Sequence, residues 1–348
     1  MLFRQLFDGV SYTYTYLIAP GEGGEALIID PVLEQLDRYL QLLEELDLRL
    51  VKSIDTHVHA DHISAIGALR DKTSCVTMMG RQSMVDVVSM RIDDGDKIEI
   101  EGIRLDAIYT PGHTDDSYCF AMSDRVLTGD ALFIRGTGRT DFQHGDAIAG
   151  YDSLFNKLLT LPDETLVYPG HDYKGDTVST IGEERRFNPR LQVGSAEEYA
   201  AIMDNLGLPN PKLMDVAVPA NMKMGLEQMD PEIAERSLAP GDAKNRQDTG
   251  GTIFVDLRET DERLKTGVIE GSVHVPYQRL GEFVRPGGTL SALATGDKPI
   301  LLYCAYGERS ALALKFMRGA GFENIRHLAG GIDAWINSGA AVEAPEEG

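Results

Sequence analysis

The segment Thr-His-Val-His-Ala-Asp-His, residues 56–62, is the sequence feature that most constrains the fold. It holds three imidazoles and a carboxylate, and it directly follows an apolar segment, 48–55, that is typical of a buried strand. Imidazoles that are buried without a ligand each need a separate hydrogen-bond partner. A metal ion at the end of the strand satisfies them together, so the segment predicts a metal-binding loop.

Three later positions offer ligands of the same chemical type. His113 follows a Pro-Gly pair, Asp130 follows a glycine, and His171 follows a second Pro-Gly pair. Each of these loops begins where a predicted strand ends, which is where protein scaffolds commonly display functional side chains. Imidazole and carboxylate ligands without a thiolate favour zinc, iron or manganese over a structural thiolate site.

The first part of the chain alternates predicted strands with a helix. Residues 33–46 carry Leu and Val at helical spacing and predict an amphipathic helix. Residues 97–110 predict a hairpin that turns near the Glu-Gly pair at 101–102. The remaining strands before the first histidine loop are expected at 11–19, 25–30 and 48–55.

The pattern changes between residues 222 and 251, where Pro, Gly and charged residues accumulate without a sustained apolar face. Beyond this stretch, strands alternate with helices, which indicates βαβ units and a parallel sheet. We therefore expect two α/β domains, at 1–225 and 250–348, joined by a linker at 226–249. Strands of the second domain are expected at 252–257, 272–276, 299–304 and 324–328.

The composition excludes several classes of partner. The 33 Lys and Arg residues stand against 55 Asp and Glu, a net charge of −22 that repels nucleic acid and anionic membranes. No stretch reaches the ~18 apolar residues of a membrane span, and the N-terminal residues lack a signal-peptide profile. The three cysteines, an odd number without a close pair, argue against a disulfide framework. A cytoplasmic location is therefore expected.

Residues 1 to about 225 resemble the metallo-β-lactamase superfamily and, more closely, the persulfide dioxygenases related to the ethylmalonic encephalopathy protein. The resemblance implies an αββα sandwich with a metal at its edge. Besides residues 56–62, it is carried by GRTDFQ at 138–143, YPGHDYKGDTVST at 168–180, EERRFNPRL at 183–191 and AVPANMKMG at 217–225.

The resemblance also implies a cofactor and a reaction. In that family one Fe(II) is held by residues that correspond here to His57, His113 and Asp130, a facial triad that leaves one face of the ion open for two reactants. The implied reaction converts glutathione persulfide and dioxygen into sulfite and glutathione. Four residues are expected around the ligands, where they orient them and relay protons: Asp61, as a catalytic residue, with His59, His62 and His171.

Glutathione carries two carboxylates, so cationic and hydroxyl donors are expected near the metal. The candidates from the family-like segments are Arg139, Tyr173 and Arg190. A dinuclear glutathione thioester hydrolase of the glyoxalase II type remains the alternative, because every ligand that it needs to hold two metals and activate a bridging hydroxide is present. The segments at 138–143 and 188–191 favour the dioxygenase.

Cys304 lies at the end of an apolar strand, followed by a short loop and a helix that is expected to start near Ser310. Backbone N–H groups and the positive end of a helix dipole favour a thiolate at such a position. Arg309 supplies a cation close by in the sequence. Together these features predict a nucleophilic cysteine, with Arg309 as a second catalytic residue.

The chain from about residue 250 onward resembles a rhodanese domain, through DLRETDERLKTGVIEGSVHVP at 256–276 and LAGGIDAWINSG at 328–339. Four residues separate Cys304 from Arg309, whereas phosphatase relatives of this fold have five. The shorter loop fits a transferred sulfur atom, although it is less basic than the commonest rhodanese loop. Four polar residues of this domain are expected to be structural: Asp256, Arg258, His274 and His327.

The two resemblances imply a shared intermediate. A rhodanese moves sulfur between thiosulfate, the Cys304 persulfide and glutathione, and the dioxygenase consumes glutathione persulfide. The expected partners are therefore glutathione, its persulfide, thiosulfate, sulfite and dioxygen. A second domain that only carries or senses sulfur is a further alternative. The direction of sulfur flow and the oligomeric state stay open, with a homodimer as one option.

Overall fold

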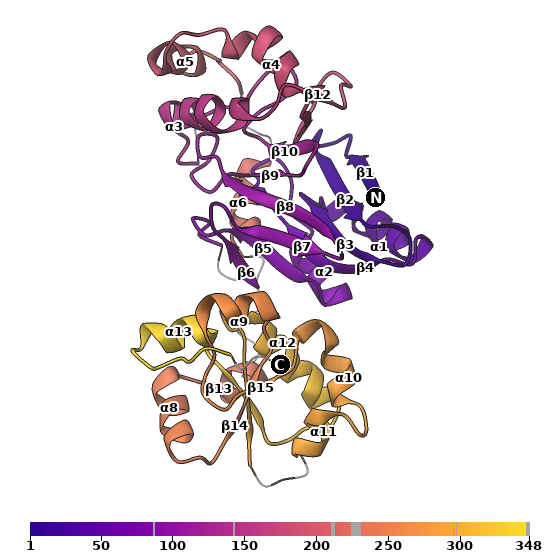
Figure 1. The fold of residues 1–348 in the computed structure, drawn as a ribbon, viewed down its shortest axis with the longest axis vertical. Coiled ribbons are helices and arrows are strands. Elements are labelled where there is room, and N and C mark those ends of the chain that lie inside the picture. Colours follow the sequence, from indigo (N-terminus) through magenta and orange to yellow (C-terminus); the bar gives the residue numbers. More distant parts are fainter. Residues whose placement is uncertain are drawn as a thin grey trace. The chain divides into compact units, whose positions relative to one another are not determined.

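The computed structural model describes residues 1–85, 88–141, 143–209, 213–223, 231–294, 296 and 298–345. The chain forms two compact units (Figure 1). The first unit comprises Met1–Asp86 and Arg91–Met224, and the second comprises Val87–Met90 and Gly225–Gly348. Within the described residues, no helix is both long enough and apolar enough to cross a membrane.

Among its described residues, the first unit contains two six-stranded sheets. The strands of one sheet, in spatial order, are β1 (Leu2–Phe7), β2 (Tyr14–Ala19), β3 (Glu25–Ile29), β4 (Arg49–Ile54), β5 (Val76–Gly80) and β6 (Met90–Ile92). Those of the other are β12 (Ser179–Thr180), β11 (Leu166–Pro169), β10 (Arg125–Gly129), β9 (Tyr118–Ala121), β8 (Ile103–Tyr109) and β7 (Lys97–Ile100).

The predicted hairpin at 97–110 is confirmed. β7 and β8 pair antiparallel, with Ile100 opposite Ile103. The two residues between the strands, Glu101 and Gly102, both have positive φ angles, of 33° and 84°. Such backbone angles suit a tight turn between right-twisted strands, and glycine adopts them without steric cost.

Helices cover the sheets where apolar side chains face outward. In the first sheet, α1 (Leu36–Glu45) buries Tyr39 and Leu43, and α2 (Ile66–Thr73) buries Leu69. These side chains join strand residues in one apolar cluster. The helical spacing at 33–46 therefore predicted the correct element, because its apolar stripe is the face that packs on the sheet.

The second sheet carries its own helices. Ile181 of α4 (Ile181–Phe187) and Tyr199 and Met203 of α5 (Ala196–Met203) pack in one cluster with strand residues. Two sheets, each with helices on its outer face, make the expected αββα sandwich. The remaining α-helices described in this unit are α3 (Ala147–Asp152) and α6 (Met214–Asn221).

The described part of the second unit holds a five-stranded sheet whose strand pairs are all parallel. Its strands, in spatial order, are β13 (Ser237–Leu238), β17 (Ile325–Leu328), β16 (Ile300–Tyr303), β14 (Ile253–Asp256) and β15 (Val273–His274). Its α-helices are α7 (Pro231–Arg236), α8 (Pro240–Asp248), α9 (Thr260–Thr266), α10 (Leu280–Val284), α11 (Thr289–Ala294), α12 (Glu308–Gly319) and α13 (Gly331–Asn337).

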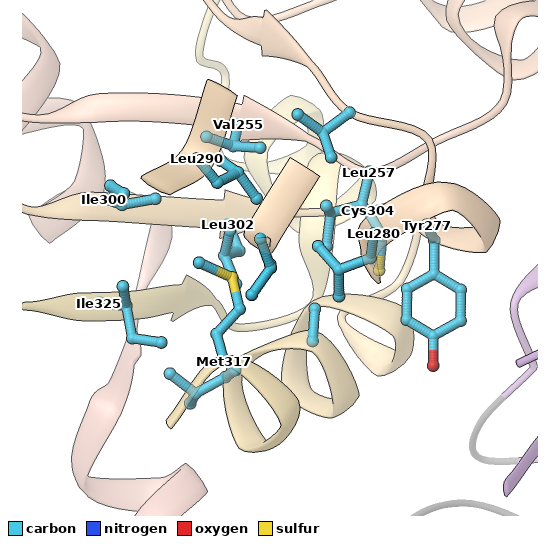
Figure 2. Packing of buried hydrophobic residues seen from close by; sticks show 14 of the residues in the cluster. Val255, Leu257, Tyr277, Leu280, Leu290, Ile300, Leu302, Cys304, Met317 and Ile325 are labelled. Atoms are coloured by element: carbon cyan, nitrogen blue, oxygen red, sulfur yellow. The ribbon is translucent and has the colours of Figure 1, made fainter. Parts of the chain in front are cut away.

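Apolar residues of the sheet and of its helices fill the core of this unit. All residues of β16 are buried, as expected for a strand covered on both faces. Figure 2 shows Leu302 of β16 beside Met317 of α12, with Val255 and Ile325 from the neighbouring strands. Trp335, the only tryptophan in the sequence, lies fully buried in a second cluster of this unit.

The structure differs from the expected linker at 226–249. Within this range, β13 pairs with β17, and Ala243 of α8 is buried in an apolar cluster of the second unit. The pattern did not reveal these elements because β13 spans two residues and α8 buries only Ala243 among polar neighbours. Residues 224–230 lie outside the described residues.

Candidate metal centre and cysteine loop

Three of the predicted metal ligands converge in the structure. His57 follows β4, His113 lies between β8 and β9, and Asp130 follows β10. One ligand atom from each residue lies within 4.8 Å of the others. The two imidazole rings are 5.0 Å apart between centroids and nearly perpendicular, so they approach a common point from different directions.

Neighbouring groups orient the two imidazoles. His57 Nδ1 lies 3.0 Å from Thr56 Oγ1, and Thr56 in turn donates to the buried Asp30 carboxylate. His113 Nδ1 donates to the Arg139 carbonyl oxygen at 2.7 Å, which leaves Nε2 unprotonated when the ring is neutral. Burial lowers the pKa of His57 well below its ordinary value. Both imidazoles can therefore present a lone pair, as metal binding requires.

Glycines allow the loops to approach Asp130. A Cβ atom at Gly138 would lie 2.1 Å from the Asp130 carbonyl oxygen and 3.0 Å from the His113 ring. A Cβ atom at Gly170 would lie 2.7 Å from Asp130 Oδ1. Any other residue at these positions would displace a ligand, which explains two glycines of the family-like segments.

His59, Asp61 and His62 form a second group, again with one ligand atom each within 4.8 Å of the others. His62 Nδ1 pairs with Asp61 Oδ2 at 3.0 Å, and His59 Nε2 with Asp30 Oδ1 at 3.1 Å. Among the described residues, neither His59 Nδ1 nor His62 Nε2 has a hydrogen-bond partner, although both atoms are buried. Buried polar atoms without a partner are costly, so this donor set fits a site that binds an ion or water.

His171 connects the two groups. Its Nδ1 lies 2.7 Å from Asp130 Oδ1, and its Nε2 lies 2.8 Å from Asp61 Oδ2. Burial opposes protonation, but the two carboxylates raise the pKa of His171 well above its ordinary value. Thr13, which the sequence analysis missed, places Oγ1 3.1 Å from both His171 Nε2 and Asp61 Oδ2. No metal-ligand pattern surrounds Thr13 in the sequence to signal this role.

Asn221 of α6 is a second residue that the sequence analysis missed. Its buried side chain donates to the carbonyl oxygens of His59 and His62, both at 2.9 Å, and accepts from the Ser64 N–H group. One amide therefore fixes the backbone of the histidine loop at three points. The signal in the sequence was the family-like segment at 217–225, which did not indicate which of its residues mattered.

Two of the three residues expected to bind glutathione are engaged by the protein itself. The Arg139 guanidinium pairs with Asp141 and donates to the Pro209 carbonyl oxygen at 2.7 Å. The Arg190 guanidinium donates to the carbonyl oxygen of Thr137. Arg139 nevertheless contributes to the candidate metal centre through its own carbonyl oxygen.

Tyr173, the third residue, lies beside the candidate metal centre. Its ring stacks on His171 with 6.0 Å between centroids and 12° between planes, and the residue is 64% exposed. The ring of Tyr12 lies next to that of Tyr173, with 5.4 Å between the ring centroids. An exposed aromatic ring with a hydroxyl group can contact a substrate that reaches the site from solvent.

In the second unit, the loop after β16 surrounds Cys304 with backbone groups. The sulfur accepts a hydrogen bond from the Gly307 N–H group at 3.1 Å, and Gly307 has a φ angle of 97°, in the region that favours glycine. The N–H group of Ile332, in α13, donates to the Cys304 carbonyl oxygen at 2.8 Å. A Cβ atom at Gly331 would lie 2.4 Å from that oxygen. Close packing against α13 therefore shapes the loop.

Arg309 is buried, interacts electrostatically with Cys304, and binds a carboxylate of a neighbouring helix. It forms two hydrogen bonds, of 2.6 and 2.7 Å, with the carboxylate of Glu262 in α9. The ion pair therefore ties the cysteine loop to α9, and the group that donates to the sulfur is a backbone amide. Asp256 and Arg258 likewise form a buried ion pair at 2.6 Å, in line with the structural role expected for them.

Comparison with known families assigns the class of each unit. The metallo-β-lactamase superfamily model matches residues 8–87 and 80–171, and the rhodanese-like domain model matches residues 239–338. A metallo-β-lactamase from Staphylococcus aureus, 21% identical, covers 95% of the chain with a TM-score of 0.60, which shows a shared fold. The chain therefore joins a metallo-β-lactamase domain to a rhodanese domain.

Individual relatives define the family more closely. The chain is 48% identical over 230 residues to human mitochondrial persulfide dioxygenase ETHE1, covering 65% of this chain and 90% of the relative. The crystal structure of ETHE1 from Myxococcus xanthus is 55% identical, covers 64% of this chain and 98% of that structure, and has a TM-score of 0.62. The chain thus belongs to the persulfide dioxygenase family and carries an additional rhodanese domain.

Proposed function

We propose that the first unit oxidises glutathione persulfide with dioxygen and water to glutathione and sulfite, using one Fe(II) held by His57, His113 and Asp130. The observation that carries this proposal is the convergence of these three side chains within 4.8 Å of one another. The chain is also 48% identical to a human persulfide dioxygenase, over 90% of the length of that relative. Two imidazoles and one carboxylate are the ligand set of non-haem iron sites with open positions.

When bound, Fe(II) supplies an open face at which a persulfide sulfur and dioxygen meet. The protein's own groups keep the three ligands in place. Thr56 and the Arg139 carbonyl hold the imidazoles, and His171 holds one oxygen of Asp130. Asp61, His59, His62 and His171 are proposed to orient this set and to take up the protons that the oxidation releases.

Tyr173 is the proposed contact for glutathione, since its exposed ring lies on His171. Arg139 and Arg190 have guanidinium groups that already bind a carboxylate or a carbonyl oxygen of the protein. Their proposed contribution is to shape the loops around the site. Recognition of the glutathione carboxylates is then assigned to the surface near Tyr173.

The second unit is proposed to transfer sulfur through Cys304. The thiolate attacks the outer sulfur of thiosulfate, which forms the Cys304 persulfide and releases sulfite. Glutathione then takes the outer sulfur and becomes the persulfide that the first unit consumes. A cytoplasmic location is proposed because the three cysteines, all within the described residues, form no disulfide, as in a reducing compartment.

A dinuclear thioester hydrolase is the second candidate for the first unit. His59 Nδ1 and His62 Nε2 favour it, because these buried atoms, without partners among the described residues, are available as further ligands. Such a site would activate a water molecule and would not consume dioxygen.

Metal analysis combined with an oxygen electrode separates the two candidates. Protein purified with iron should contain one iron per chain and should consume dioxygen when glutathione persulfide is added. Two metal ions per chain, with hydrolysis of a glutathione thioester and no oxygen uptake, would contradict the dioxygenase proposal.

A further inference from the structure

A row of buried polar groups extends from Cys304 into the interior of the second unit, to which Cys304 itself belongs. Cys304 Sγ lies 3.7 Å from Ser310 Oγ in α12, and Ser310 Oγ lies 3.3 Å from His327 Nδ1 in β17. On the other side of the ring, His327 Nε2 lies 2.7 Å from Ser237 Oγ in β13. The sheet register places Ser237 directly opposite His327. His327, which was expected to be only structural, therefore connects to the sulfur through one hydroxyl group.

The hydrogen bonds assign the protons of this row. Ser237 donates its hydroxyl hydrogen to the Ile233 carbonyl oxygen at 2.8 Å, so Ser237 Oγ accepts the hydrogen of His327 Nε2. His327 Nδ1 is then an acceptor. Burial lowers the pKa of His327 to about 4, which keeps the ring neutral near neutral pH. His327 is therefore placed to accept a hydrogen bond from Ser310.

Ser310 has one hydroxyl hydrogen and three acceptors within reach. These are the Gly307 carbonyl oxygen at 3.0 Å, His327 Nδ1 at 3.3 Å, and Cys304 Sγ at 3.7 Å. A neutral thiol donates to Ser310 Oγ, whereas a thiolate can only accept. Cys304 is 1% exposed, so a negative charge on its sulfur depends on donors from the protein. The Gly307 N–H group is one donor, and the Ser310 hydroxyl can turn to become a second.

We propose that Ser310 donates to Cys304 Sγ as the sulfur atom leaves, its hydroxyl turning away from His327 Nδ1, which accepts its hydrogen before that step. This inference rests on the proposed sulfurtransferase function. During discharge, the glutathione thiolate attacks the outer sulfur of the Cys304 persulfide and forms a new S–S bond with it. The bond between the outer sulfur and Sγ breaks, and its electron pair remains on Sγ. The step needs no oxidant or reductant.

The proposal predicts unequal effects on the two halves of the reaction. Negative charge develops on Sγ during discharge, so a donor aimed at Sγ stabilises that transition state. During loading from thiosulfate, the same charge disappears from Sγ, and the donor gives no advantage. Loss of the Ser310 hydroxyl should therefore slow discharge and leave loading unchanged or faster.

Single-turnover measurements on the full chain test this asymmetry. The protein is loaded with thiosulfate, freed of excess donor and mixed with glutathione, and the remaining protein-bound sulfur is followed in time. Ser310→Ala should slow discharge about tenfold, the effect of one hydrogen bond to a charged atom. Ser272→Ala, which removes a hydroxyl group from the same unit outside this row, should discharge like the wild type. The fluorescence of Trp335 checks that each variant is folded.

Substitutions of His327 provide a second, independent test. His327→Leu removes an acceptor that competes with Sγ for the one hydroxyl hydrogen, so discharge should keep the wild-type rate or become up to about threefold faster. His327→Asn places an amide oxygen near the position of Nδ1 and should discharge like the wild type.

Equal slowing of loading and discharge in Ser310→Ala, or discharge at the wild-type rate, would overturn the assignment of Ser310. Discharge slowed in His327→Leu as much as in Ser310→Ala would show that His327 does not compete with Sγ for the Ser310 hydrogen. A wild-type chain that takes up no sulfur from thiosulfate would contradict the proposed sulfurtransferase function itself, and the inference would fail with it.

Discussion

The two candidate sites are built in different ways. The metal centre gathers side chains from loops between His57 and His171, and two buried imidazole nitrogens there have no partner among the described residues. The cysteine site uses one short loop, and its sulfur accepts from a backbone amide of that loop. The first site therefore holds buried side-chain atoms that an ion or water can satisfy, whereas the sulfur of the second is already bound by a backbone group of the chain.

Because of this difference, substitutions should inactivate the two sites in different ways. Removing one ligand from a three-ligand metal site removes a large part of the binding energy of the ion, and the reaction is lost with it. The cysteine site instead depends on backbone shape, so it fails when the packing of its loop against α13 is disturbed.

The largest effect is expected at the metal ligands. His113→Ala or Asp130→Ala removes one of three ligands, so bound iron and oxygen uptake with glutathione persulfide should both fall to background. Metal analysis and an oxygen electrode measure the two quantities. His144→Ala changes an exposed histidine outside the candidate ligand groups and should retain both.

His59→Ala refines this prediction, because His59 is proposed to act around the ligands rather than as one of them. It should lose activity while keeping much of its iron. Complete loss of iron in His59→Ala, equal to that in His113→Ala, would contradict the three-ligand assignment.

The second largest effect is expected at Gly331. This residue has a φ angle of 60°, and a Cβ atom there would lie 2.4 Å from the Cys304 carbonyl oxygen. Gly331→Ala should lower the free energy of unfolding of the second unit by about 3 kcal/mol, as expected for backbone strain combined with a steric clash. Urea unfolding followed by Trp335 fluorescence measures it.

Gly319→Ala is the matched control, because nothing lies within 4 Å of a Cβ atom at that helical position. Its unfolding midpoint should equal or slightly exceed that of the wild type. A Gly331→Ala variant with the wild-type midpoint and full sulfur transfer would show that close packing against α13 does not shape the loop.

A smaller effect is expected at Asn221, which holds the histidine loop at three backbone groups. Asn221→Ala should weaken iron binding about 10- to 100-fold, the range found for groups that support metal ligands. Competition with a chelator measures the affinity. Asn156→Ala, which removes an exposed amide, should bind iron like the wild type. Equal affinities in both variants would exclude a supporting role for Asn221.

Residues of the candidate metal centre could be predicted from the sequence, whereas the residues that support them could not. His57, His59, Asp61 and His62 form a contiguous pattern whose residue types have few structural uses, and this pattern marks the site directly. Asn221 lies far along the chain and is an ordinary amide in the sequence. Its function arises only because α6 packs against the histidine loop, which is a property of tertiary structure.

The second unit shows the same limit. Cys304 was predictable because a strand, a short loop and a helix follow one another in the sequence. The contact between Ser310 and His327 depends on how α12 packs on β17, and the sequence does not encode that packing as a local pattern. The ion pair of Arg309 could not be predicted for a related reason, since its partner Glu262 lies on a different helix.

The smallest effect expected is the loss of folding stability at low pH that arises from protonation of His327. Burial lowers its pKa to about 4 in the folded chain, below the ordinary value of 6.5, so the unfolded chain binds the proton more readily. Stability from this residue is complete above pH 6.5 and is lost as the pH falls toward 4. The loss between about pH 7 and about pH 5 should be about 2 kcal/mol.

Urea unfolding followed by Trp335 fluorescence at both pH values measures this loss, and His327→Asn is the reference because it removes the titrating group. The wild type should lose more stability than His327→Asn over this range. Equal losses would show that His327 does not carry this pH dependence.

Oxygen uptake by Cys304→Ser shows whether two independent sites are linked by glutathione persulfide, which the second unit is proposed to form and the first to consume. The serine hydroxyl stays protonated near neutral pH and cannot carry a persulfide. The variant should consume oxygen like the wild type when glutathione persulfide is supplied, and should consume none when thiosulfate and glutathione are supplied instead. Uptake with thiosulfate and glutathione that persists in Cys304→Ser, or loss of uptake with glutathione persulfide while iron is retained, would contradict this proposal.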